Sequence, residues 1–79
     1  MKKLHEVVFY SGEEPFPAYY LIDTINCENI EDELKNRLAR ITQRVRRMFG
    51  IGDDTSDWKI HKALYVLQED GLIAVRNIA

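Results

Sequence analysis

The strongest pattern in this sequence is an apolar stripe at helical spacing between Asn29 and Phe49. Asn29 is a suitable N-cap, acidic side chains crowd the first turn that would follow it, and Gly50 can adopt the left-handed conformation that ends a helix. The pattern therefore predicts one long amphipathic helix over residues 29–49. Its inward-facing residues are predicted to be Ile30, Leu34, Leu38, Ile41, Val45 and Met48.

Two stretches before this helix have the composition of strands. Residues 4–10 and 18–25 are rich in Val, Ile, Phe and Tyr, and the segment between them contains Pro15 and Pro17. The two prolines favour extended backbone around Phe16, which makes this side chain a candidate contact residue. The alternative is that Phe16 folds back over the hairpin.

The C-terminal third predicts a second helix and a third strand. The helix is expected to begin within residues 53–57, to carry Ile60, Leu64 and Leu67 inward, and to end at Gly71. Residues 72–78 then form a strand, with Leu72 contacting Leu67. The predicted fold is a single domain over residues 1–79, a two-layer α+β structure in which two helices pack on a three-stranded antiparallel sheet, in the order ββααβ.

The predicted strands carry more apolar residues than one layer of helices can cover. A chain of 79 residues buries only about 60–65% of its surface on folding, so it gains much from association. Either the helices divide between the two faces of the sheet, or a partner covers one face. The uncovered positions are predicted to be drawn from Leu4, Val8, Tyr10, Tyr19, Leu21 and Ile25. The candidate partner-binding residues are Tyr10, Phe16, Tyr19 and Leu21, because apolar and aromatic side chains suit interfaces.

The net charge of −2 hides a strongly uneven distribution. Residues 1–36 carry three basic and eight acidic side chains, residues 37–47 carry five arginines and no acid, and residues 48–79 carry three basic and five acidic side chains. On a helix, four of the five arginines fall within an arc of about 80°, and Arg46 lies outside it. We call the four the arginine stripe: Arg37, Arg40, Arg44 and Arg47.

Three interpretations of the arginine stripe compete. It can be a solvated helix flank, with Glu33 pairing Arg37 at i−4 and the later arginines complementing the C-terminal end of the helix dipole. It can contact the phosphates of a nucleic acid, since arginine suits forked recognition of anions. It can also bind a protein with an acidic surface, including the acidic N-terminal half of a second copy.

Catalytic and metal-binding patterns are missing. Cys27 is the only cysteine, which excludes an intramolecular disulfide and favours a reducing, cytoplasmic location. His5 and His61 have no partner at a catalytic or ligand spacing, and helix capping accounts for Asp53, Asp54 and Asp57. The first residues show no export or anchoring signal. We therefore expect no enzyme activity, no cofactor, no metal and no membrane contact.

The sequence favours a small, non-enzymatic binding or regulatory protein that acts through protein–protein contacts. Its expected partner is a second copy of itself, in a homodimer, or another protein with an acidic or apolar surface. The competing hypothesis is a nucleic-acid-binding protein that uses the arginine-rich helix. No family resemblance is specific enough to transfer functional residues.

Overall fold

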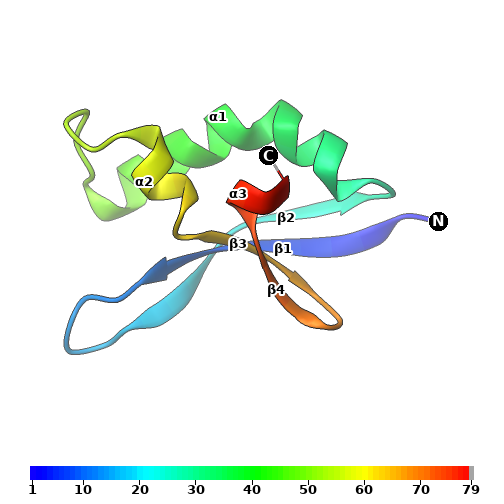
Figure 1. The fold of residues 1–79 in the computed structure, drawn as a ribbon, viewed down its shortest axis with the longest axis horizontal. Helices are drawn as coiled ribbons and strands as arrows, with labels where there is room; N and C mark the ends of the chain where they lie inside the picture. Colours follow the sequence, from blue (N-terminus) through cyan, green and yellow to red (C-terminus); the bar gives the residue numbers. More distant parts are fainter. Residues whose placement is uncertain (79) are drawn as a thin grey trace.

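An antiparallel sheet with helices on one side forms the protein in the computed structural model, which describes residues 1–78 (Figure 1). The elements follow the chain as β1 (Lys3–Ser11), β2 (Ala18–Cys27), α1 (Ile30–Phe49), α2 (Asp57–His61), β3 (Leu64–Gln68), β4 (Gly71–Ala74) and α3 (Val75–Ile78). Neighbouring strands are antiparallel in the order β2-β1-β3-β4. The α+β class and the antiparallel sheet are confirmed, but the prediction of three strands in the order ββααβ is wrong, because the described chain has four.

Helix α1 begins and ends as the sequence predicts. The Asn29 side chain accepts hydrogen bonds from the backbone N–H groups of Glu31 and Asp32, at 3.1 and 3.3 Å. Gly50 takes the left-handed conformation with φ 63°, and its N–H bonds to the carbonyl of Arg46. Both ends of the helix are thereby capped, which removes part of the cost of its unpaired backbone groups.

The buried face of α1 departs from the predicted stripe at its C-terminal end. Met48 is half exposed, and Phe49 instead packs on Phe9 with ring centroids 4.9 Å apart. Phe49 lies about 40° from Val45 around the helix, whereas Met48 lies about 60° away on the other side. Phe49 also meets Tyr20 edge-on at 5.2 Å, so the first hairpin supplies both of its aromatic contacts.

The second half of the chain is where the prediction fails most. Helix α2 has only five residues, and the segment expected to continue it forms the β3–β4 hairpin. Glu69 and Asp70 form the turn, and Gly71 adopts φ 121°, which only glycine accommodates readily. The predicted strand over residues 72–78 ends at Ala74, and α3 follows it. Leu67 and Leu72 do pair, but across this hairpin and not across a helix cap.

A bulge in β2 changes which of its side chains face the helices. Val7 pairs with Asp23 and Val8 with Leu21, so Ile22 has no partner in β1. Because one extra residue reverses the alternation of a strand, Ile22, Asp23 and Ile25 all lie on the helix side. Ile25, predicted among the uncovered residues, is in fact only 1% exposed.

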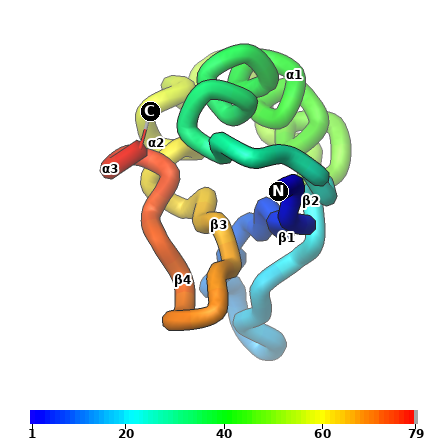
Figure 2. Tube along the Cα trace, turned by 90° about the vertical axis from the view of Figure 1, so that its right-hand side faces the viewer, coloured from blue at the N-terminus to red at the C-terminus, as the bar shows by residue number. Residues whose placement is uncertain are grey.

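The three described helices all lie over the same face of the sheet, and the two hairpins extend away from them (Figures 1 and 2). The core between the layers combines residues from both hairpins and all three helices. The helices therefore do not divide between the two faces, and no helix within residues 1–78 covers the second face. The largest fully buried side chains are Val7, Ile25, Leu34, Ile41, Val45, Ile60, Leu64, Val66 and Val75.

Candidate protein-binding face

The uncovered side of the sheet, which we call the open face, is predominantly apolar. Its members follow from the register of the four strands, since alternate residues of paired strands share a face. Six of them are large apolar side chains that are each at least 39% exposed: Leu4, Tyr10, Tyr19, Leu21, Leu67 and Leu72. The others are Glu6, Val8, Thr24, Asn26, Tyr65 and Ala74.

Three tyrosines cluster on the open face toward the end of the sheet where β1 and β2 are connected. The Tyr10 and Tyr19 rings are 4.9 Å apart, and Tyr65 meets Tyr19 edge-on at 5.8 Å. Tyr10 and Tyr19 are cross-strand partners, and Tyr65 pairs with Val8 from the other side of β1. Val8 is buried beneath these neighbours although no helix covers it. The cluster is thus a packed aromatic platform with hydroxyl groups at its surface.

The predicted partner-binding residues come together at the end of the sheet where β1 and β2 are connected. Tyr10, Tyr19 and Leu21 lie on the open face, with Leu21 opposite Val8 in the register. Phe16 lies in the β1–β2 connection beyond Tyr10 and Tyr19, and it is 77% exposed. The alternative that Phe16 folds back over the hairpin is therefore wrong. Sequence reasoning missed Tyr65 and Leu67 because it assigned them to a helix, and it missed Leu72 because it expected this side chain to contact Leu67 at the end of that helix.

The arginine stripe is partly neutralised by the chain itself. Arg37 Nε lies 3.3 Å from a Glu33 carboxylate oxygen, and a second nitrogen of Arg37 lies 3.8 Å from Asp23. Arg44 donates to the carbonyl of Ile22 at 3.1 Å and lies 3.9 Å from Asp23. Only Arg40 and Arg47 of the stripe make no ion pair or hydrogen bond with another residue of the described chain.

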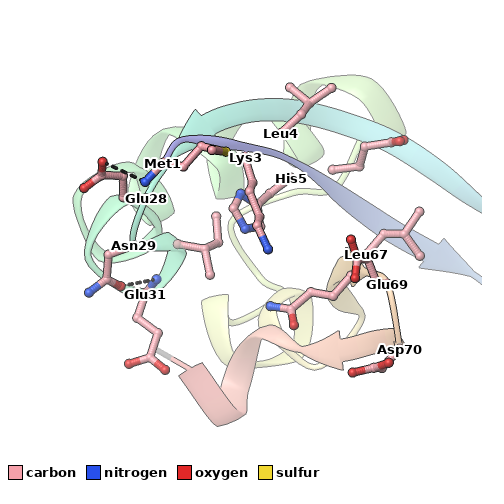
Figure 3. Close-up of a pocket in the computed structure, with 13 residues that line it drawn as sticks. Met1, Lys3, Leu4, His5, Glu28, Asn29, Glu31, Leu67, Glu69 and Asp70 are labelled. Atoms are coloured by element: carbon pink, nitrogen blue, oxygen red, sulfur yellow. Dashed lines mark hydrogen bonds and ion pairs between the residues drawn. The ribbon is translucent and has the colours of Figure 1, made fainter.

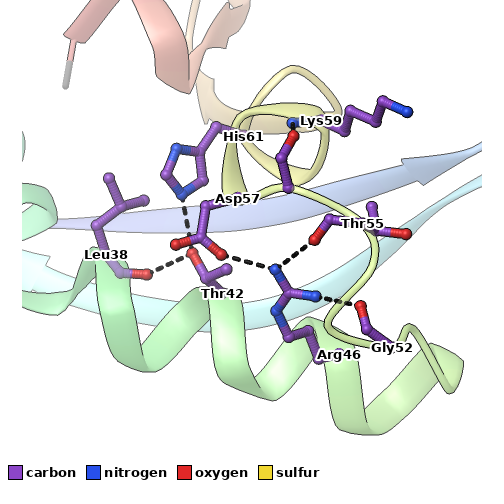
Figure 4. A network of polar contacts seen from close by, with 9 residues as sticks. Leu38, Thr42, Arg46, Gly52, Thr55, Asp57, Lys59 and His61 are labelled. Atoms are coloured by element: carbon purple, nitrogen blue, oxygen red, sulfur yellow. Dashed lines mark hydrogen bonds and ion pairs between the residues drawn. The ribbon is translucent and has the colours of Figure 1, made fainter.

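Arg46 is the arginine whose role the sequence did not reveal. Its side chain is only 10% exposed, and its guanidinium donates to the carbonyls of Gly52 and Thr55 at 2.6 and 2.7 Å and to Asp57 Oδ1 at 2.7 Å (Figure 4). The forked group therefore fixes the connection between α1 and α2. Its position beside Val45 and Phe49, at the edge of the buried stripe, is the one signal that distinguishes it from the other arginines.

Thr42 and His61 form a second bond between the same helices (Figure 4). The Thr42 hydroxyl donates to the carbonyl of Leu38 at 2.7 Å. His61 Nε2 lies 3.0 Å from the hydroxyl oxygen of Thr42. A hydroxyl has one hydrogen, so His61 Nε2 must be the donor in the second bond. This bond joins the two helices through their side chains and gives both groups a structural role.

Cys27 is buried at the end of β2, and its Sγ lies 3.7 Å from His5 Nδ1. Burial raises the pKa of the Cys27 thiol, and the nearby Glu33 carboxylate raises this pKa further, against smaller opposing effects of Arg37 and Lys2. The thiolate is the reactive form of cysteine. This environment therefore disfavours a nucleophilic role for Cys27.

An acidic trough of about 980 Å³ opens between the start of β1, the start of α1 and the β3–β4 turn (Figure 3). The basic groups that line it are Lys3, His5 and the N-terminal amine, and the amine pairs with Glu28 at 3.2 Å. The excess of acid makes the trough unsuited to phosphate or other anions. Its carboxylates are Glu6, Glu28, Glu31, Glu69 and Asp70.

Within residues 1–78, no three His, Cys, Asp or Glu side chains gather in a way that could hold a metal ion. No helix of the described chain is long and apolar enough to cross a membrane.

Comparisons with protein-family models, with curated proteins and with solved structures give no match.

Proposed function

We propose that this protein is a non-enzymatic binding or regulatory module that acts through protein–protein contacts, and that the open face is its binding surface. The partner is a second copy of the chain or another protein with an apolar surface. The observation that carries the proposal is the tyrosine cluster of Tyr10, Tyr19 and Tyr65, with Leu21 beside it, on a sheet face that no helix covers.

The composition of this face is that of an interface centre. Aromatic side chains are enriched at the centres of protein interfaces and charged residues are depleted there. Glu6 is the only ionisable group of the open face besides the tyrosine hydroxyls. Large contiguous apolar patches are uncommon on proteins that stay monomeric, and they usually mark binding sites.

A pair of matched variants tests the proposal. Leu21 on the open face and Met48 on α1 are each 52% exposed, so Leu21→Glu and Met48→Glu place the same new charge at equally accessible positions. Immobilised wild-type protein and Met48→Glu are expected to retain the same protein from a lysate, or an added untagged copy of the chain, and Leu21→Glu is expected to lose it. Retention of the same protein by all three, or by none, contradicts the proposal.

Nucleic-acid binding through α1 is the competing proposal. Its support is the arginine stripe, of which Arg40 and Arg47 remain unengaged among the described residues. Against it stand the engagement of Arg37 and Arg44 with Asp23 and with other groups of the chain, and the burial of Arg46. We rank it second for this reason.

A further inference from the structure

We infer that the occupant of the open face is a second copy of this chain, packed face to face about a two-fold axis that passes near Val8 and Leu21. This inference rests on the proposed function, since it names the partner of the same surface. A two-fold interface brings one patch against itself, so the patch must be complementary to itself in chemistry, charge and size.

The hydrogen-bonding groups of the open face can pair with groups of a second copy. With the axis across the strands at Val8, Tyr10 and Tyr19 of one copy lie opposite Glu6 and Thr24 of the other, because both pairs are one side-chain repeat from Val8. The hydroxyls of Tyr10, Tyr19, Tyr65 and Thr24 and the amide of Asn26 each supply both a donor and an acceptor. A face carrying only carboxylates or only ammonium groups would repel itself. Two copies can therefore satisfy the polar edges of the tyrosines without any other molecule.

The position of Glu6 fixes where the axis can lie. Glu6 pairs with Thr24 and Leu67, one side-chain repeat along β1 from Val8. A repeat of two residues spans about 7 Å, so an axis that runs across the strands through Val8 and Leu21 separates the two Glu6 carboxylates by about 14 Å along the strands. The two carboxylates are then not in contact, and Glu6 of each copy lies opposite Tyr10 and Tyr19 of the other, whose hydroxyls can donate to it. An axis through Glu6 itself would bring like charges together.

The exposed apolar area is of the right order for a dimer. Six large apolar side chains of the face are between 39 and 67% exposed, which amounts to on the order of 500 Å² given the size of such side chains. A standard interface buries about 800 Å² per partner, of which more than half is apolar. The remaining area is available from Thr24, Asn26, Tyr65 and Phe16.

The free edge of the sheet at β2 is a poorer site for association than the face. The bulge at Ile22 interrupts the row of backbone groups, and Arg44 already occupies the Ile22 carbonyl at 3.1 Å. Bulges and basic side chains at an edge strand hinder pairing with another chain. Stacking of two sheets, which places them about 10 Å apart, leaves this edge unaffected.

Charge-swap complementation at Leu21 tests the inference directly. Leu21→Glu and Leu21→Lys are each expected to weaken self-association at least about 100-fold, because each places like charges on both sides of the axis. An equimolar mixture of the two is expected to associate within about tenfold of the wild type, since only the mixed pair has opposite charges. Sedimentation equilibrium and energy transfer between labelled chains measure both effects, and Met48→Glu, at the same exposure, is expected to leave the association unchanged.

The outcomes separate this inference from the proposed function. If Leu21→Glu and Leu21→Lys associate as well as the wild type, or if their mixture recovers nothing, the two-fold arrangement is overturned. If the wild type stays monomeric but holds a different protein that Leu21→Glu loses, the inference fails and the proposed function stands. If the monomeric wild type holds nothing, both fail.

Discussion

Arg46 donates a 2.7 Å hydrogen bond to Asp57 Oδ1, and with it joins the end of α1 to the start of α2. The same guanidinium reaches the carbonyls of Gly52 and Thr55, so one side chain orders the whole connection between the two helices. This connection brings Ile60 into the core and leads the chain into β3. The second hairpin, and with it part of the open face, is thus placed through Arg46.

Removal of Arg46 should destabilise the protein clearly. Arg46→Ala leaves two carbonyls without their donor, and we expect the free energy of unfolding to fall by about 2–3 kcal/mol. Arg46→Lys should recover less than half of this loss, because an ammonium cannot reproduce the planar fork. Urea denaturation measures both. Arg47→Ala, the adjacent and exposed control, should change the value by less than about 0.5 kcal/mol, and an equal loss in both variants would refute the assigned role.

The sequence predicted α1 well because its information is local. The cap at Asn29, the apolar stripe and the stop at Gly50 all lie within one element. Residues 64–68 were misassigned because a short run of apolar residues fits a buried helix and a strand equally well. The turn at Glu69 and Asp70 followed by Gly71 was the signal that favoured a hairpin.

The bond between Thr42 and His61 should contribute measurably to stability. In the wild type, Thr42→Val removes two hydrogen bonds, one to the Leu38 carbonyl and one to His61. In a His61→Leu background, Thr42→Val removes only the bond to the Leu38 carbonyl. A double-mutant cycle of these substitutions therefore isolates the contact between the two side chains. We expect a coupling free energy of about 0.5–1.5 kcal/mol from urea denaturation. A coupling near zero would show that the two groups do not interact in solution.

The two glycines with positive φ should respond to substitution through the backbone alone. A Cβ added at Gly50 or Gly71 would meet no atom within 4 Å, so crowding does not contribute. Gly50→Ala should cost about 1–2 kcal/mol and Gly50→Asn less, because asparagine tolerates the left-handed region. Gly71→Ala should cost more than Gly50→Ala, since φ 121° lies further from what a side chain permits. Equal melting temperatures for Gly50→Ala and Gly50→Asn would contradict this.

The site was only partly predictable, for a reason that lies in β2. Tyr10, Tyr19 and Leu21 were identified from the surplus of apolar residues, but strict alternation wrongly placed Ile25 on the same face. No local signal in the sequence marks Ile22 as the extra residue of the bulge, because the bulge depends on pairing with β1. Arg46 was missed for a similar reason, since its acceptors belong to a loop whose path is set by tertiary contacts.

Cys27 should react slowly with alkylating reagents in the folded protein. Its raised pKa keeps the group as a thiol at neutral pH, and burial restricts access. Because the thiol loses its proton more readily in the unfolded chain, this group's contribution to stability should be constant at neutral pH and should fall as the pH rises above about 8.5. Iodoacetamide labelling with and without urea measures the first effect. Equal rates in the two conditions would contradict the buried position.

The affinity of this protein for duplex DNA should depend only weakly on salt concentration, because few arginines of α1 are free to contact phosphates. When the logarithm of the association constant is plotted against the logarithm of the salt concentration, each phosphate contact on duplex DNA contributes about −0.9 to the slope. With Arg40 and Arg47 as the arginines of the stripe left unengaged by the described chain, the slope should be no steeper than about −2, and binding at physiological salt should be undetectable. Titration of duplex DNA at about 50 and 200 mM salt, with the Arg40→Ala/Arg47→Ala double variant as control, measures it. A slope of about −3.6, the value for four phosphate contacts, would require Arg37 and Arg44 to leave Asp23 for phosphates, and would favour nucleic-acid binding over the protein-binding function proposed for the open face.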